Sequence, residues 1–196
     1  MANEQHSLAT YVSDMLALER HIRVPFDTQQ NDGDFKDYAD AYALVSRLAA
    51  LCDTHVDQLK STLDRLGGQE ASPIKSAVVE VEGAVAGAID KLRKTKVSKS
   101  LRDDYTALAL CCVSYSMLVT TANSMGDEQV ASLAQRLLQD YAQAVLEIGD
   151  AIPAVVVQEL RATGLDVETS VIEPSRTQIR EAWVNSQEFR RADSSV

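Results

Sequence analysis

Five side chains that can bind metal ions stand in this sequence at spacings typical of helices. Cys52 and His55 are three residues apart, so on a helix they would share one face and could hold one ion together. Glu19 offers a carboxylate upstream of this pair, and Cys111 and Asp140 offer a thiol and a second carboxylate downstream. Thiolate ligands favour a soft ion such as zinc, and a site of this composition could instead hold iron, manganese or no metal at all.

Each candidate ligand also has an interpretation that needs no metal. Glu19 could pair with one of the basic residues that follow it within four positions, and Asp140 could face solvent. His55 could lie at the edge of a core and form a hydrogen bond with Glu19 or Asp140. The cysteines could pack as small apolar side chains, because cysteine is among the most buried residue types.

The elements that would carry these residues are predicted to be helices. Gly and Pro are sparse, and Ala, Leu, Gln, Glu, Asp and Lys fill the stretches between them, which favours helix. Capping residues, glycines and prolines give the helix limits, and the predicted helices span 7–24, 34–66, 72–94, 100–126 and 127–161. Pro153 should kink the last of these or end its regular part. The segment 166–174 lacks a helical period, and a short helix could follow over 175–192.

Apolar residues on these helices follow the four-three spacing of helices that pack in a bundle. Glu19 continues the stripe of the first helix, which is Leu8, Val12, Met15 and Ile22. The second carries Ala41, Val45, Leu48, Cys52, His55, Leu59, Thr62 and Leu66. The fourth carries Leu101, Tyr105, Leu108, Cys112, Tyr115, Val119 and Ala122. The fifth carries Val130, Leu133, Leu137, Asp140, Ala144, Glu147 or Ile148, and Ala151. We therefore expect an all-α, antiparallel helix bundle over residues 1–164 and a C-terminal extension over 165–196.

This pattern resembles the ferritin-like superfamily of four-helix bundles, and within it the YciE/YciF type of stress-response protein. The resemblance covers residues 7–160 and rests on Tyr11–Glu19, His55–Gly68 and Met125–Asp140. The predicted helix over 72–94 also stands where that group has an inserted helix. Glu and Glu-x-x-His recur twice in such bundles and bind two metal ions.

The resemblance implies a degenerate metal site. Glu19 and His55 match the family pattern, but Cys52 stands where the first motif has Glu. On the fourth helix Cys111, or its neighbour Cys112, stands in place of a carboxylate, and Asp140 with Gln143 replaces the second motif. The implied protein is a cytoplasmic stress-response protein, unsuited to efficient ferroxidase chemistry, that forms a homodimer or a higher homo-oligomer.

A second hypothesis is a non-catalytic structural module that kept the bundle and lost the chemistry. It would bind another subunit or a protein partner through residues 174–196, which carry the aromatic residues Trp183 and Phe189. A thiol-based redox protein is a weaker third hypothesis. Cys111 and Cys112 would point about 100° apart on a helix, which strains a disulfide between them.

Composition excludes several other classes of protein. The chain has 196 residues, a length suited to one domain, and 19 Lys and Arg against 29 Asp and Glu give a net charge of −10. Such acidity argues against nucleic-acid binding and against docking on an anionic membrane. No unbroken apolar run approaches the length of a membrane span. An odd number of cysteines, two of them adjacent, suits the reducing cytoplasm.

Overall fold

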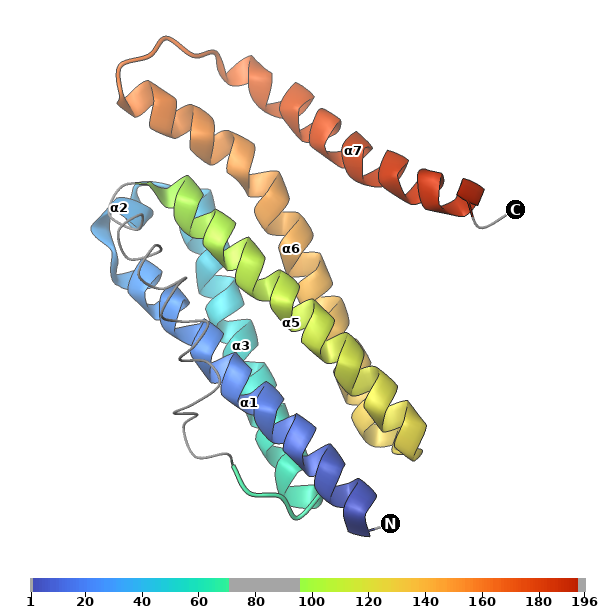
Figure 1. Ribbon diagram of the computed structural model, residues 1–196. Coiled ribbons are helices and arrows are strands. Elements are labelled where there is room, and N and C mark those ends of the chain that lie inside the picture. The colour runs from blue at the N-terminus through green and yellow to red at the C-terminus, as the bar shows by residue number, and fades with distance from the viewer. Residues whose placement is uncertain (1, 71–95, 194–196) are drawn as a thin grey trace, which may run out of the picture.

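The computed structural model describes residues 2–70 and 96–193, and the regular elements in that part of the chain are all helical. Four of the described helices make up the body of the protein: α1 (Ala2–Asn31), α3 (Ala39–Arg65), α5 (Val97–Met125) and α6 (Glu128–Ala162) (Figure 1). We call these four the core helices. The short helix α2 (Gly33–Lys36) joins α1 to α3, and the 3-10 turn η1 (Thr169–Val171) leads into α7 (Ile172–Asp193). The predicted all-α class is confirmed.

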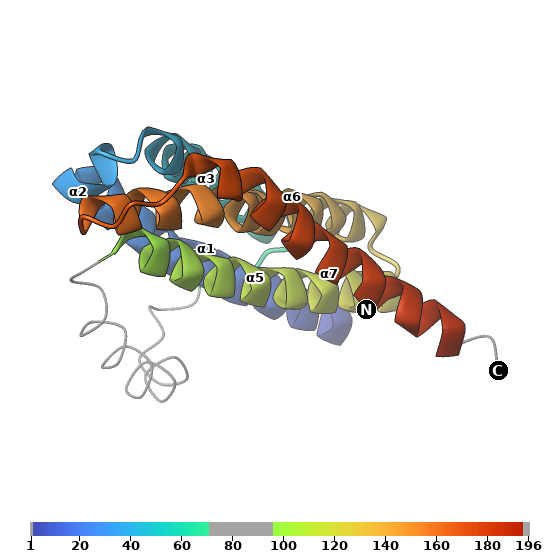
Figure 2. The ribbon, with the colours of Figure 1, turned by 90° about the horizontal axis from the view of Figure 1, so that it is seen from above.

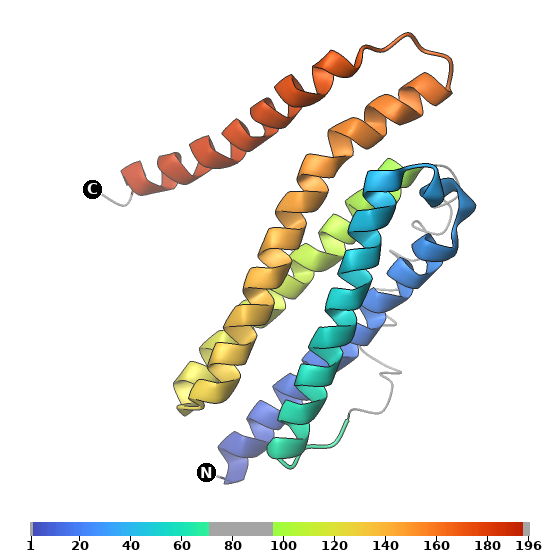
Figure 3. The ribbon, with the colours of Figure 1, turned by 180° about the vertical axis from the view of Figure 1, so that it is seen from behind.

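The core helices form two antiparallel pairs, α1 with α3 and α5 with α6, which pack against each other around one apolar core. Helices α1 and α6 run in one direction, and α3 and α5 run in the other (Figure 1, Figure 3). The end of α3 and the start of α5 therefore lie at opposite ends of the body. The helix predicted over 72–94 falls in this connection and lies outside the described residues.

The predicted apolar stripes match the buried faces with one systematic shift. In α3 the stripe is buried as expected, except that Leu63 takes the place of Thr62. In α5 the buried positions include Asp104, Cys111 and Leu118, whereas the prediction placed the residue after each of these inside. The shift arises because α5 has apolar residues on both flanks of its buried face, so a four-three pattern fits either of two phases.

Several predicted helix limits were wrong: the helix predicted over 34–66 is divided into α2 and α3, and proline misled two other limits. Pro25 lies inside α1, which continues to Asn31, and Phe26 and Gln29 beyond it are buried. Packing of this last part of α1 offsets the loss of the helical hydrogen bond that proline cannot donate. Pro174 lies in the first turn of α7, where proline lacks only an amide that has no helical partner. Pro153 likewise lies inside α6 and does not end it.

Local capping fixes the turn between α5 and α6. Gly126 adopts a left-handed conformation with φ of 71°, and its amide bonds the Asn123 carbonyl. The Asp127 carboxylate then accepts a hydrogen bond from the amide of Val130 at 2.9 Å, which caps the start of α6. The same carboxylate pairs with Arg65 near the end of α3. One short turn therefore holds the α5–α6 pair and ties it to α3.

Two glycines that both face open space separate the effect of backbone conformation from the effect of packing. We expect Gly126→Ala to lower the free energy of unfolding by about 1 kcal/mol, because alanine is strained at positive φ. We expect Gly149→Ala, inside α6, to raise it by about 0.5–1 kcal/mol, because alanine is the better helix former. Urea unfolding of the two variants measures both effects. A gain of stability in Gly126→Ala would contradict the left-handed turn assigned to Gly126.

Candidate functional site

The carboxylate of Glu19 on α1 meets one polar side chain from each of the other core helices. Glu19 is fully buried. The hydroxyl of Tyr115 on α5 donates a short hydrogen bond to Oε1, and the hydroxyl of Tyr141 on α6 donates a short hydrogen bond to Oε2. The ring of His55 on α3 places Nδ1 3.2 Å from Oε1. We call Glu19, His55, Tyr115, Tyr141 and Asp140 the polar network.

His55 connects the buried carboxylate to the surface. Its Nε2 lies 3.2 Å from Oδ2 of Asp140, and the Asp140 side chain is 48% exposed. The imidazole is itself buried and meets the Tyr141 ring edge-on at a centroid distance of 4.8 Å. The two interpretations considered for His55, a bond to Glu19 and a bond to Asp140, are therefore both realised by one ring.

The geometry limits which atoms of the polar network can donate hydrogen bonds. Both ring nitrogens of His55 face carboxylate oxygens, which accept and do not donate when ionised. Each of these contacts is a hydrogen bond that the ring nitrogen can donate. The Tyr141 hydroxyl uses its hydrogen in the bond that it donates to Glu19. In the contact between Cys52 and Tyr141, where sulfur and oxygen are 3.3 Å apart, the thiol of Cys52 is therefore the donor. Every group in the network then has a partner.

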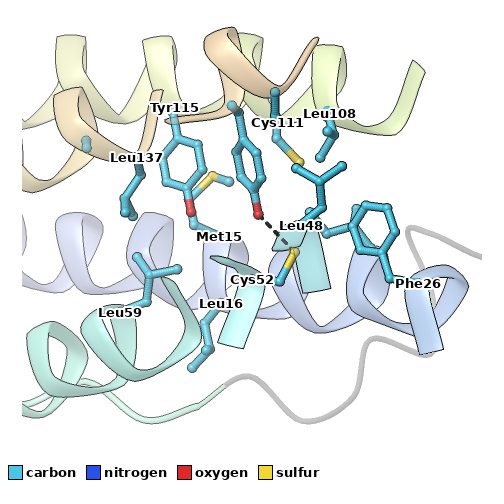
Figure 4. Close-up of a cluster of buried hydrophobic side chains, with 14 of the residues drawn as sticks. Met15, Leu16, Phe26, Leu48, Cys52, Leu59, Leu108, Cys111, Tyr115 and Leu137 are labelled. Atoms are coloured by element: carbon cyan, nitrogen blue, oxygen red, sulfur yellow. Dashed lines mark hydrogen bonds between the residues drawn. The ribbon is translucent and has the colours of Figure 1, made fainter. Parts of the chain in front are cut away.

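The three cysteines are protonated thiols that are buried or half-buried in the protein. Cys52 and Cys111 are buried among leucine and phenylalanine side chains (Figure 4). Burial raises the pKa of the Cys52 thiol to about 12 and raises that of Cys111 well above its usual range, and the negative charge of Glu19 adds to both shifts. Cys112 is half-buried, and its pKa is also raised by burial.

The same two causes keep the tyrosines of the network protonated. Burial, and then the charge of Glu19, raise the pKa values of Tyr115 and Tyr141 above the usual range for tyrosine. Both hydroxyls therefore remain hydrogen-bond donors, which is the role that Glu19 requires of them.

The five predicted ligands are only partly brought together. Glu19, His55 and Asp140 form a chain of contacts, and Cys52 joins it through Tyr141. Cys111 lies in the apolar core beside this chain. The Asp140–Gln143 pair does not form as predicted, because Gln143 turns outward to Glu147.

In this arrangement the residues do not fit a metal centre. Both carboxylate oxygens of Glu19 and both ring nitrogens of His55 are engaged by protein groups. Within residues 2–70 and 96–193, no group of three or more His, Cys, Asp or Glu side chains is placed to hold an ion. A metal would have to displace the two tyrosine hydroxyls from Glu19.

Tyr115 and Tyr141 are the functional residues that the sequence interpretation missed. Tyr115 stood on a predicted stripe and was taken for a packing residue. Tyr141 follows Asp140, the residue that had been placed on the buried stripe, and the structure buries Tyr141 and exposes Asp140. The signal was a carboxylate on an apolar stripe, which needs donors from the facing helices.

A cavity of about 450 Å³ lies away from the polar network, between the start of α3, the second half of α6 and Arg176 of α7. Asp37, Asp40, Glu147 and Asp150 make its lining acidic. Its acidic groups already have basic partners in part, since Arg47 pairs with Glu147 and Arg180 pairs with Asp150.

Comparison with known proteins identifies the fold alone. No protein-family model matches the sequence, and no curated protein matches it. A crystal structure of a protein from Xanthomonas campestris pv. campestris is similar, with a TM-score of 0.66 and 18% sequence identity. The similarity covers 83% of this chain and 99% of that one.

Removing one donor tests the role of the tyrosines. We expect Tyr141→Phe to lower the free energy of unfolding by about 1.5–3 kcal/mol, because it deletes a hydrogen bond to a buried carboxylate. Tyr105→Phe is the matched control, since the half-buried Tyr105 hydroxyl has no partner among the described residues. We expect this control to change stability by less than about 0.5 kcal/mol in urea unfolding. Equal losses in the two variants would show that the bond to Glu19 is not what makes the Tyr141 hydroxyl important.

Thiol titration tests the buried cysteines. With a pKa of about 12, only about one Cys52 thiol in ten thousand is ionised at pH 8. We therefore expect an aromatic disulfide reagent at pH 8 to react with one thiol of the native protein, Cys112, and with all three after denaturation. The native reaction should disappear in Cys112→Ser. Rapid reaction of all three thiols in the native protein would contradict their burial.

Proposed function

We propose that this protein is a non-catalytic assembly module, a ferritin-like four-helix bundle that uses α7 to bind a second copy of the chain. The fold part of the proposal is supported by the directions of the core helices. Two antiparallel pairs joined by one long connection are the arrangement of ferritin-like bundles. The Xanthomonas campestris protein, at 18% identity, shares the fold of this chain.

The absence of catalysis is supported by the polar network. In a di-metal bundle the inward carboxylates and histidines bind ions. Here two tyrosine hydroxyls and one imidazole form hydrogen-bond contacts with both carboxylate oxygens of Glu19. The group that would bind metal therefore serves to hold the core helices together.

The observation that carries the proposal is the position of α7. This helix of 22 residues lies against α6 near its start, where Arg176 and Arg180 bind Asp150, and then diverges from the core helices (Figure 1, Figure 2). Trp183 and Val184 are each 55% exposed, and Ile179 is exposed as well. An apolar stripe on a projecting helix is the form in which helices are recognised by grooves on other proteins.

Charge favours a second copy as that partner. Four arginines and four acidic residues give α7 no net charge, so the net charge of −10 belongs to the rest of the chain. Most surfaces of two copies would repel each other. Because α7 has no net charge, one acidic copy can approach another through this helix without electrostatic repulsion.

Trp183 reports directly on this contact because it is the only tryptophan in the sequence. We expect its fluorescence to become protected from acrylamide quenching as protein concentration rises, and sedimentation to show association over the same range. Ile179→Glu, in the full chain, should weaken this association at least about tenfold, because it places a charge in an apolar contact.

Val24→Glu is the control, since Val24 is also an exposed apolar residue, on α1, at 60% against 38% for Ile179. It should leave both readouts unchanged. Quenching of the wild-type protein that is independent of concentration would contradict self-association through α7. About one equivalent of iron, manganese or zinc in protein purified without chelator, lost in His55→Ala, would contradict the absence of a metal centre.

A further inference from the structure

The outer face of α5 carries an apolar stripe directly opposite its buried face. Leu110, Val113 and Met117 are 56%, 61% and 52% exposed, although each is a large apolar side chain. They are separated by three and four residues, so they lie in one row along the helix. Thr106 and Thr120 continue the row at its two ends with the same spacing and are also exposed. This four-three pattern is the one that buried helix seams show.

No charged residue interrupts this face. Residues 105–126 contain no Asp, Glu, Lys, Arg or His in a chain whose net charge is −10. By length and composition α5 is the described helix that could cross a membrane, yet its inward face is packed against α1 and α6. The apolar surface of α5 that is exposed is the row from Thr106 to Thr120, which is about 21 Å long at the helical rise of 1.5 Å per residue.

The row is nearly symmetric about its centre, with a threonine at each end and a large apolar side chain on each side of Val113. Its residues in order are Thr, Leu, Val, Met and Thr, with Val113 at the centre. If a second α5 lies antiparallel across the first at Val113, Leu110 of each copy faces Met117 of the other. Thr106 of each copy then faces Thr120. A patch that complements itself when turned by 180° is what a two-fold interface requires.

We propose that the outer face of α5 is a homodimer interface, formed by two antiparallel α5 helices that cross at Val113 on a two-fold axis. The small residues Ala109, Ser114 and Ser116 flank the row and allow the helices to approach closely. A second copy is the occupant that the charge distribution favours, because it adds no like charge at the contact. This interface is independent of α7.

A cysteine at the axis tests the geometry. Packed helices lie about 8–10 Å apart, and each Cα lies about 2.3 Å from its helix axis. Two facing Cα atoms at the crossing are therefore roughly 3.5–5.5 Å apart, which overlaps the range of a disulfide. In the full chain with Cys112→Ser, we expect Val113→Cys to form a covalent dimer under mild oxidation. Val24→Cys in the same background is the control and should not.

Val113→Glu supplies a second readout that does not depend on cysteine chemistry. It should weaken dimerisation at least about tenfold in sedimentation, while Val24→Glu leaves it unchanged. Covalent dimers that persist when Ile179→Glu is added would support the α5 interface even if the proposed role of α7 fails.

Three outcomes would overturn the proposal. Equal cross-linking of Val113→Cys and Val24→Cys would show random collision. A monomer at all concentrations whose residue 113 is protected from labelling would show that residues 71–95 of the same chain cover the face. Co-sedimentation with neutral lipid vesicles, without cross-linking at residue 113, would show that the face binds a membrane.

Discussion

The buried charge of Glu19 is the constraint on which the arrangement of the core helices depends. Moving a carboxylate from water into a protein interior costs on the order of several kcal/mol unless donors surround it. Here the donors come from three other helices, His55 on α3, Tyr115 on α5 and Tyr141 on α6. Apolar packing alone tolerates small shifts and rotations of one helix on another. A carboxylate that needs three directed contacts does not, so the polar network sets the register of all four helices.

The tyrosines change what a carboxylate and a histidine in a bundle can do. A metal ion would supply positive charge to Glu19 and would compete with the protons of its partners. In this protein the histidine ring and the tyrosine hydroxyls supply hydrogen-bond partners to Glu19 from the chain itself. Burial and the charge of Glu19 raise the pKa values of both tyrosines, so the donors that Glu19 needs are also the groups least able to lose their protons. The network is self-consistent without a ligand.

The sequence was sufficient to predict the elements but not their detailed contacts. The all-α class and the end of α3 at Gly67 follow from spacing and capping, and so does the start of α6 at Asp127; the structure confirms all three. The phase of the α5 stripe could not be predicted, because both flanks of the helix are apolar and only the facing helices decide between them.

At the site, the sequence identified Glu19 and His55 as inward residues but not the tyrosines that join them. Hydrophobic patterns indicate which residues are buried, but they do not indicate which polar atoms form hydrogen bonds with each other. The exchange between Asp140 and Tyr141 shows this limit, since a rotation of 100° along the helix separates an exposed carboxylate from a buried donor.

The distribution of charge is consistent with the assembly proposed through α5 and α7. A solvated helix in an acidic protein would be expected to carry charges on its outer face, as α3 and α6 do. Helix α5 carries none over residues 105–126, and the charges of α7 balance. The inward face of α5 is already accounted for by the core, so core packing does not explain the apolar residues outside it. A contact through α5 uses the same patch on both copies, so it produces a dimer and does not extend further. A contact through α7 uses residues that the α5 contact does not use, so the two proposed contacts are independent of each other. The acidic remainder of each copy would then limit association to these neutral surfaces.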